Sequence, residues 1–247
     1  MTAGVLVDLS NVTRTYGGVR VLDSVSMAIR PGVTVVIGPN GSGKSTLLGS
    51  IAGTIDPTAG DVRYTGPDAA RRIGYLPQRI PFRDGFTARE TIAFYASLVD
   101  EPPDETLERV GLTDAADRRV EALSGGMRRL LGIAQATVGD PPLVVLDEPA
   151  SGLDPGMRER AFEVATSRAS ESTAVVVSSH DLDLVDRHTD DVVLLHRGRV
   201  AAAGSRESLL NEYGVADVEE LYRAIIEDGG RTDDEPEAVH VAGVSDR

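Results

Sequence analysis

The sequence contains no cysteine and no tryptophan, and Lys44 is the single lysine among its 25 basic residues. Without cysteine the chain has no disulfide framework, no thiolate nucleophile and no zinc–thiolate site. No uninterrupted apolar run approaches the ~20 residues that cross a bilayer, and the N-terminus lacks the basic segment and apolar run of a secretory signal. We therefore expect a cytosolic chain, so that any membrane involved must be crossed by another protein.

Positive charge is also scarce, because 39 acidic residues against 25 basic residues leave a net charge of −14 and a pI near 4.7. This charge repels nucleic-acid phosphates at long range, so we expect no nucleic acid as a partner. The acid excess is typical of a salt-adapted archaeal proteome, as in a halophilic archaeon, where salt screens a self-repelling surface. A genomic bias towards arginine codons explains the lysine shortage equally well, but it does not explain the acids.

The remaining composition describes an ordinary globular interior. The 247 residues are 41% hydrophobic and have a mean hydropathy of −0.11, which suits one large α/β domain or a core carrying a small subdomain. Thirteen prolines and 26 glycines exclude a coiled coil. The function must therefore be sought in local motifs.

The lysine lies in a segment with the phosphate-loop pattern of glycine, four residues, glycine, lysine and a hydroxyl. A β-branched strand is expected at 33–37 and a helix after the loop. Glycines let successive N–H groups curl round an anion, and the helix N-terminus adds partial positive charge. Lys44 would neutralise the β and γ phosphates, and Ser45 would offer its hydroxyl to Mg²⁺. The predicted binding residues here are Gly38, Pro39, Asn40, Gly41, Ser42, Gly43, Lys44, Ser45 and Thr46.

A continuous apolar run at 143–146 ends in two acids, Asp147 and Glu148, as expected of a central parallel strand whose carboxyl end reaches a site. Two adjacent carboxylates at such a position need a counter-charge. The pattern predicts that Asp147 holds Mg²⁺, directly or through water. It also predicts that Glu148 polarises a water for attack on the γ phosphate.

Four further segments narrow the function. Ser124 is expected to cap a helix at which Gly125 and Gly126 present a second set of free N–H groups to an anion. The other three segments place Gln78 after a short strand, His180 after a strand at 174–177, and Asp154 shortly after Glu148. Each segment alone is a weak signal, but their combination in this order is not expected by chance.

From Leu6 to about Leu210 the sequence resembles the ATP-binding cassette family, the motor subunits of membrane transporters. GPNGSGKST is similar to the family's Walker A motif, LVVLDEP to its Walker B motif and LSGGM to its signature motif. YLPQ resembles the Q-loop, SGLD the D-loop and SSHDL the H-loop. Upstream, Tyr16 in TYGG is similar to the aromatic residue that stacks on adenine.

This resemblance implies the fold class: α/β, with a P-loop NTPase (RecA-like) core, an antiparallel β subdomain and an inserted helical subdomain. It implies an ATPase that uses ATP and Mg²⁺. Two ATP-binding subunits, identical or different, would pack head to tail around two nucleotides, and a transmembrane permease would receive the motion. The chain would lie peripherally at the cytoplasmic face of the membrane.

The resemblance also assigns roles to residues. Ser124, Gly125 and Gly126 of one subunit would grip the γ phosphate that lies on Lys44 of its partner. Asp154 would couple the two sites across the interface. The implied catalytic residues are Lys44, Gln78, Glu148 and His180, and the implied Mg²⁺ ligands are Ser45, Gln78 and Asp147.

The interval between the Q-loop and the signature has a helical composition, with helices expected at 88–98, 106–110 and 113–119 and a break at Pro102 and Pro103. It is similar to the family's helical subdomain, and residues 79–82 lie where such proteins receive the permease. We therefore divide the chain into a catalytic core at 1–82 and 140–210, a helical signature subdomain at 83–139, and a C-terminal part at 211–247. That last part should contain a helix and, from Asp228, a disordered acidic tail.

The signature departs from the commonest pattern, because Met127 stands where a glutamine is usual. A side-chain hydrogen bond from this position to the opposite ribose is lost, while the backbone donors are unaffected. The variant LSGGMRR resembles the branch that powers ABC-2 type exporters with separate six-span permeases. This resemblance favours export.

Two other functions compete with a transport ATPase. A soluble cassette ATPase acting on nucleic acid or the ribosome usually carries a long coiled coil or two cassettes, and basic surfaces, whereas this chain has a compact interval at 83–120 and a net charge of −14. A regulatory cassette that clamps ATP without turnover would lack the catalytic acid or histidine. Glu148 and His180 are both present.

Overall fold

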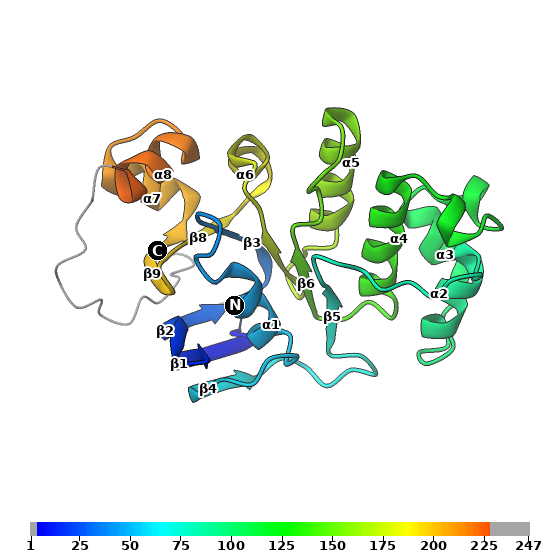
Figure 1. The fold of residues 1–247 in the computed structure, drawn as a ribbon, viewed down its shortest axis with the longest axis horizontal. Helices are drawn as coiled ribbons and strands as arrows, with labels where there is room; N and C mark the ends of the chain where they lie inside the picture. Colours follow the sequence, from blue (N-terminus) through cyan, green and yellow to red (C-terminus); the bar gives the residue numbers. More distant parts are fainter. Residues whose placement is uncertain (1–3, 228–247) are drawn as a thin grey trace.

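A six-stranded sheet runs through the centre of the computed structural model, which describes residues 4–227 (Figure 1). The strand order is β5-β6-β7-β3-β8-β9, and the pairs are parallel except β8 with β9. The strands are β3 (Gly32–Ile37), β5 (Ile73–Leu76), β6 (Leu143–Asp147), β7 (Ala174–Ser178), β8 (Asp191–His196) and β9 (Arg199–Ser205). Because parallel strands end at the same edge, the loops after β3, β5, β6 and β7 meet there.

The alternation of side chains divides the central strands between two hydrophobic cores. In β6, Val144 and Leu146 belong to the core that contains α2 to α8, whereas Leu143 and Val145 belong to the core that contains α1 and the second sheet. All five β6 residues are buried. Burial on both faces explains why this strand is a continuous apolar run, as the sequence predicted for a central parallel strand.

The second sheet is antiparallel, with the order β2-β1-β4. Its strands are β1 (Val7–Tyr16), β2 (Val19–Ile29) and β4 (Ala59–Tyr64). Helix α1 (Lys44–Ile51) packs against β1 and β2 on one side and against β6 and β7 on the other. The helix that begins at the phosphate loop is therefore fixed between the two sheets.

Helices α2 (Ala88–Ala96), α3 (Pro103–Arg109) and α4 (Gly125–Thr137) gather at one end of the molecule (Figure 1). The predicted break at Pro102 and Pro103 separates α2 from α3, but the helix expected at 106–110 is wrong at its start, because α3 begins at Pro103, where the first helical residue needs no N–H. The expected helix at 113–119 was also wrong beyond a 3₁₀ turn at Thr113–Ala115. The carbonyls of Ala116 and Arg118 accept hydrogen bonds from the first N–H groups of α2, so they cannot continue a helix.

Helices α5 (Pro155–Thr166) and α6 (Leu182–His188) follow β6 and β7, and α7 (Arg206–Tyr213) and α8 (Val218–Ile226) lie at the end opposite α2 to α4 (Figure 1). A two-residue turn joins β8 to β9, with Arg197 and Gly198 at positive φ as such a hairpin requires. The tail expected from Asp228 lies outside the described residues. Among residues 4–227, no helix is long and apolar enough to span a membrane. The α/β fold class is confirmed, and the domain boundaries stay a prediction.

Candidate functional site

The loop between β3 and α1 is built so that only glycine fits at two of its positions. A Cβ on Gly38 would lie 2.1 Å from the carbonyl oxygen of Leu195, and one on Gly43 would lie 2.7 Å from that of Val21. Gly43 has φ 107° and caps the N-terminus of α1. The backbone is therefore held tightly by β2 and β8, with its N–H groups at a helix start, where an anion is favoured.

Lys44 is the first residue of α1, directly after this loop, and only 7% of its surface is exposed. Its Nζ donates to the carbonyl oxygens of Gly38 at 2.7 Å and Pro39 at 3.3 Å. Burial lowers the pKa of Lys44, while the charges of Glu148 and Asp147 oppose that shift. Ser42 Oγ is buried and has no hydrogen-bond partner among the described residues. A cation and an unpaired hydroxyl beside the N-terminus of a helix fit a phosphate.

Asp147 ends β6, and its carboxylate is held by Ser178 at the end of the neighbouring strand β7. The hydroxyl of Ser178 donates to Asp147 Oδ1 at 2.6 Å and accepts from the backbone N–H of Glu148 at 2.8 Å. Asp147 and Ser178 are 2% and 0% exposed. The buried hydroxyl thus fixes both acidic residues at the carboxyl edge of the sheet.

Glu148 follows in a left-handed backbone conformation, with φ 50°. Its Oε2 lies 3.2 Å from Nδ1 of His180, which comes from the loop after β7. The Glu148 side chain is 10% exposed and that of His180 is 60% exposed. Non-glycine residues at positive φ persist where surrounding structure imposes them, often at active sites. The two residues line a cavity of about 130 Å³ between the loops after β6 and β7.

Gln78 is exposed in the loop after β5, and its backbone rather than its side chain makes the recorded contact. Arg129 of α4 donates Nη1 to the Gln78 carbonyl at 3.1 Å. Burial lowers the pKa of Arg129, while the charges of Asp147 and Glu148 oppose that shift. Helix α4 therefore contacts the loop of Gln78, and Arg129 interacts electrostatically with Asp147 and Glu148.

The signature residues lie at the start of α4, away from the phosphate loop. Ser124 Oγ accepts from the N–H of Met127 at 3.2 Å, which confirms the predicted serine cap. Gly125 has open space where a Cβ would be, whereas Gly126 packs on Met157 of α5. In Figure 1, β5 and β6 lie between α1 and α4. The single chain therefore does not bring these residues to Lys44.

Two other predicted residues lie at the surface. Asp154 caps α5 by accepting from the N–H of Met157 at 3.1 Å, so it has a structural role within its own chain. Tyr16 ends β1 with 43% of its surface exposed, and the guanidinium carbon of Arg14 lies 4.5 Å from its ring centroid. Stacking of Tyr16 on adenine remains a prediction, and so does the contact of Asp154 with a second subunit.

Sequence reasoning missed Ser178, Arg129 and Arg158. Ser178 directly follows the apolar run of β7, and a hydroxyl at that edge was a signal for support of the acids. Arg129, one helical turn into α4, contacts the carbonyl of Gln78 in a distant segment, and the sequence does not indicate that partner. Arg158 pairs with Asp181 at 2.8 Å, a contact between distant segments for which the sequence holds no signal.

Comparison with known proteins agrees with this geometry. Residues 22–151 match the family model described as ABC transporter. The chain is 38% identical over 216 residues to the hemin import ATP-binding protein HmuV of Rhodococcus jostii, covering 80% of this chain and 74% of that protein. It is 38% identical over 222 residues to the cobalamin import ATP-binding protein BtuD of Halobacterium salinarum, covering 82% of this chain but only 56% of that protein.

An export protein is also similar. The chain is 33% identical over 233 residues to the Nod factor export ATP-binding protein I of Mesorhizobium japonicum, covering 88% of this chain and 68% of that protein.

Solved structures show the same fold. An ATP-binding subunit of an ABC transporter superposes with a TM-score of 0.77 at 26% identity, covering 88% of this chain and 98% of that one. A dimeric bacterial ABC transporter cassette gives 0.72 at 25% identity, covering 81% of this chain and 98% of that one. The chain therefore belongs to the ABC transporter family, as one of its ATP-binding, ATP-hydrolysing subunits.

Proposed function

We propose that this chain hydrolyses ATP in a dimer of cassettes and drives a separate permease that exports its substrate. The observation that carries the proposal is the convergence of Lys44, Asp147, Glu148 and His180 at one edge of the sheet, from the adjacent strands β3, β7 and β6. An anion cradle beside a carboxylate pair suits a nucleoside triphosphate whose γ phosphate is attacked by water.

The residues of this edge divide the chemistry. The phosphate loop binds the triphosphate, and Lys44 neutralises its terminal charge. Ser45, Asp147 and Gln78 would hold Mg²⁺ through the oxygen donors that this ion prefers, and the ion would stabilise negative charge on the γ phosphate. Glu148 accepts the proton of the attacking water. His180, 3.2 Å from that carboxylate, orients it.

A second subunit completes each site. Ser124 and Gly125 are exposed at the N-terminus of α4, where unpaired N–H groups favour an anion. Since they do not reach Lys44 of their own chain, they would meet the nucleotide of a partner, as Asp154 would meet the partner's site. The similarity to a dimeric cassette supports this arrangement.

A transmembrane permease is the second partner, and it places the chain at the cytoplasmic face of the membrane. Phe94 in α2 and Leu98, two residues after it, have 60% and 71% of their surfaces exposed, in the segment 83–139 that we assign to the helical subdomain. Exposed apolar side chains of this size suit a protein contact. The transport names of the relatives support such a partner.

Export is supported by the signature variant at Met127 and by the Nod factor export relative. The hemin and cobalamin import relatives make uptake the competing direction. The acid excess and the Halobacterium salinarum relative support a halophilic archaeal source. The genes beside this one test the direction of transport, because a six-span permease without a substrate-binding protein would support export. The rest of the genome tests the proposed halophilic archaeal source. The relatives above are transport subunits, so they do not favour action on nucleic acid.

The Glu148→Gln substitution tests the chemistry. The variant keeps the shape of the side chain but loses the base, so it should bind ATP·Mg²⁺ normally and hydrolyse it about 10²- to 10⁴-fold more slowly. It should also accumulate as a dimer in ATP, measured by light scattering after size exclusion. The matched control is Glu163→Gln, an exposed acid of α5, which should keep normal turnover. Wild-type turnover in Glu148→Gln would remove Glu148 from the mechanism.

A further inference from the structure

An ion pair joins the segment that carries Asp154 to the loop that carries His180. Arg158, in the first turns of α5, donates Nη1 to Asp181 Oδ2 at 2.8 Å, and Asp181 directly follows His180. The other carboxylate oxygen of Asp181 accepts from the N–H of Leu184 at 3.3 Å and caps α6. The side chains of Arg158 and Asp181 are 38% and 18% exposed. One carboxylate therefore fixes both the start of α6 and its distance from α5.

Further contacts close a ring around the cavity beside Glu148. The N–H of Ser151 donates to the Glu148 carbonyl at 3.2 Å, which fixes the start of segment 151–154 on the catalytic acid. The Glu148 side chain meets His180, and the next residue, Asp181, meets Arg158. Arg158 lies in α5, which directly follows segment 151–154, so the ring of contacts is closed. Glu148, His180, Arg158 and Asp181 all line the same cavity of about 130 Å³.

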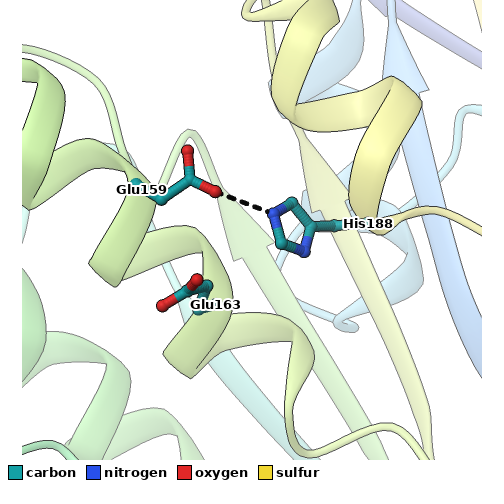
Figure 2. A group of neighbouring side chains, drawn as sticks. All are labelled: Glu159, Glu163 and His188. Atoms are coloured by element: carbon teal, nitrogen blue, oxygen red, sulfur yellow. Dashed lines mark hydrogen bonds and ion pairs between the residues drawn. The ribbon is translucent and has the colours of Figure 1, made fainter.

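A second tether between α5 and α6 lies farther from the catalytic loop. Glu159 accepts from Arg187 at 2.8 Å and 2.9 Å, and one of its oxygens lies 3.0 Å from Nε2 of His188. Figure 2 shows Glu159 pointing across to His188, with Glu163 one turn further along α5. These three side chains could ligate a metal, but the Glu159 charge is already matched by Arg187. This cluster ties the helices together without touching His180.

We propose that Arg158 is a positioning residue for ATP hydrolysis, which holds the His180 loop in register with α5 through Asp181. A movement of segment 151–154 is thereby passed to the contact between His180 and Glu148. The inference rests on the proposed function, in which Glu148 and His180 act on the attacking water. It adds a link within one chain between the segment that would face the second subunit and Glu148, the proposed base.

Steady-state ATPase kinetics of the full chain test the link, together with equilibrium ATP binding and thermal unfolding. Arg158→Ala should lower kcat about tenfold, because small misplacements of catalytic groups are costly, and should leave KM and ATP affinity unchanged. Asp181→Asn keeps a good helix cap and should lower kcat equally. The double variant should be no worse than either single variant, and Arg158→Lys should recover part of the rate.

The matched control is Glu159→Gln, which cuts the second tether from the adjacent residue. It should lower the melting temperature about as much as Arg158→Ala but leave kcat at the wild-type value. A wild-type kcat in Arg158→Ala, or an equal loss of kcat in Glu159→Gln, overturns the proposal. Failure of the proposed function is distinct, because it shows as normal turnover in Glu148→Gln whatever the Arg158 variants do.

Discussion

At the scale of single residues, one hydroxyl decides how the acidic pair is presented. Ser178 Oγ donates to Asp147 and accepts from the N–H of Glu148, with both contacts buried. A buried donor or acceptor left without a partner costs about 1–3 kcal/mol. Asp147 and Glu148 therefore depend on a neighbouring strand for both their charge environment and their backbone position.

Ser178→Ala removes both hydrogen bonds and should lower the free energy of unfolding by about 1–3 kcal/mol, measured by urea denaturation. Turnover should also fall, because Asp147 loses the donor that orients its carboxylate and Glu148 loses an anchor. Ser178→Thr is the control, since it keeps the hydroxyl in a strand that favours β-branched residues. A Ser178→Ala chain as stable and as active as wild type would show that the carboxylates need no such support.

At the scale of elements, Glu101 fastens the connection between α2 and α3 to the end of α4. It accepts from Thr106 Oγ1 at 2.6 Å and from the N–H of Gly139 at 2.5 Å, and it pairs with Arg109. Burial alone would raise the pKa of Glu101, but these hydrogen bonds and the Arg109 charge outweigh it and hold the pKa below its ordinary value. Three helices of one end of the molecule thus share one carboxylate.

Because the folded-state pKa of Glu101 is lowered, the stability it contributes is complete above the ordinary value of 4.5 and is lost as the pH falls through the lower, folded-state value. Glu101→Gln should therefore reduce the free energy of unfolding by about 1 kcal/mol at neutral pH, after allowance for solvent screening. The difference from wild type should shrink at acidic pH below 4.5. Denaturation at several pH values measures this.

The control for Glu101 is Glu108→Gln, an exposed acid of α3, which should change stability little at any pH. A pH-independent difference between Glu101→Gln and wild type would mean that the side chain contributes by packing alone. Equal losses in the two variants would mean that any charge removed from this end has the same effect.

The elements also show what the sequence could predict. The apolar runs at β3, β6 and β7 predicted the central strands correctly, because a strand that is buried on both faces needs apolar side chains at nearly every position. The glycine-rich motif likewise predicted correctly that Lys44 lies at the start of a helix, because the pattern is local in sequence. The helix predicted at 113–119 was wrong, because carbonyl groups of this segment accept hydrogen bonds from the start of α2, which is distant in sequence. Arg158 and Arg129 were missed because their partners are likewise fixed only by the tertiary fold.

At the scale of the whole molecule, the residues that we propose for one nucleotide site lie at two separate places in the chain. Lys44, Asp147 and Glu148 lie at the carboxyl edge of the central sheet, while Ser124 lies at the start of α4, with β5 and β6 between α1 and α4 (Figure 1). In a dimer with two-fold symmetry each copy would use one place for its own nucleotide and lend the other to its partner. Under this proposal, ATP hydrolysis requires two chains.

Mixing two inactive variants tests the shared site. Lys44→Ala weakens phosphate binding, and Ser124→Arg blocks the exposed start of α4, so each variant alone forms only defective sites. In a mixed dimer, Lys44 of the Ser124→Arg chain faces Ser124 of the Lys44→Ala chain, and one intact site returns. Equal mixing should restore about a quarter of wild-type turnover, since half of the pairs are mixed and each holds one of two sites. Turnover measured at increasing ratios should peak near equal amounts. A flat, inactive series would contradict the shared site, and so would a Ser124→Arg chain that is fully active alone.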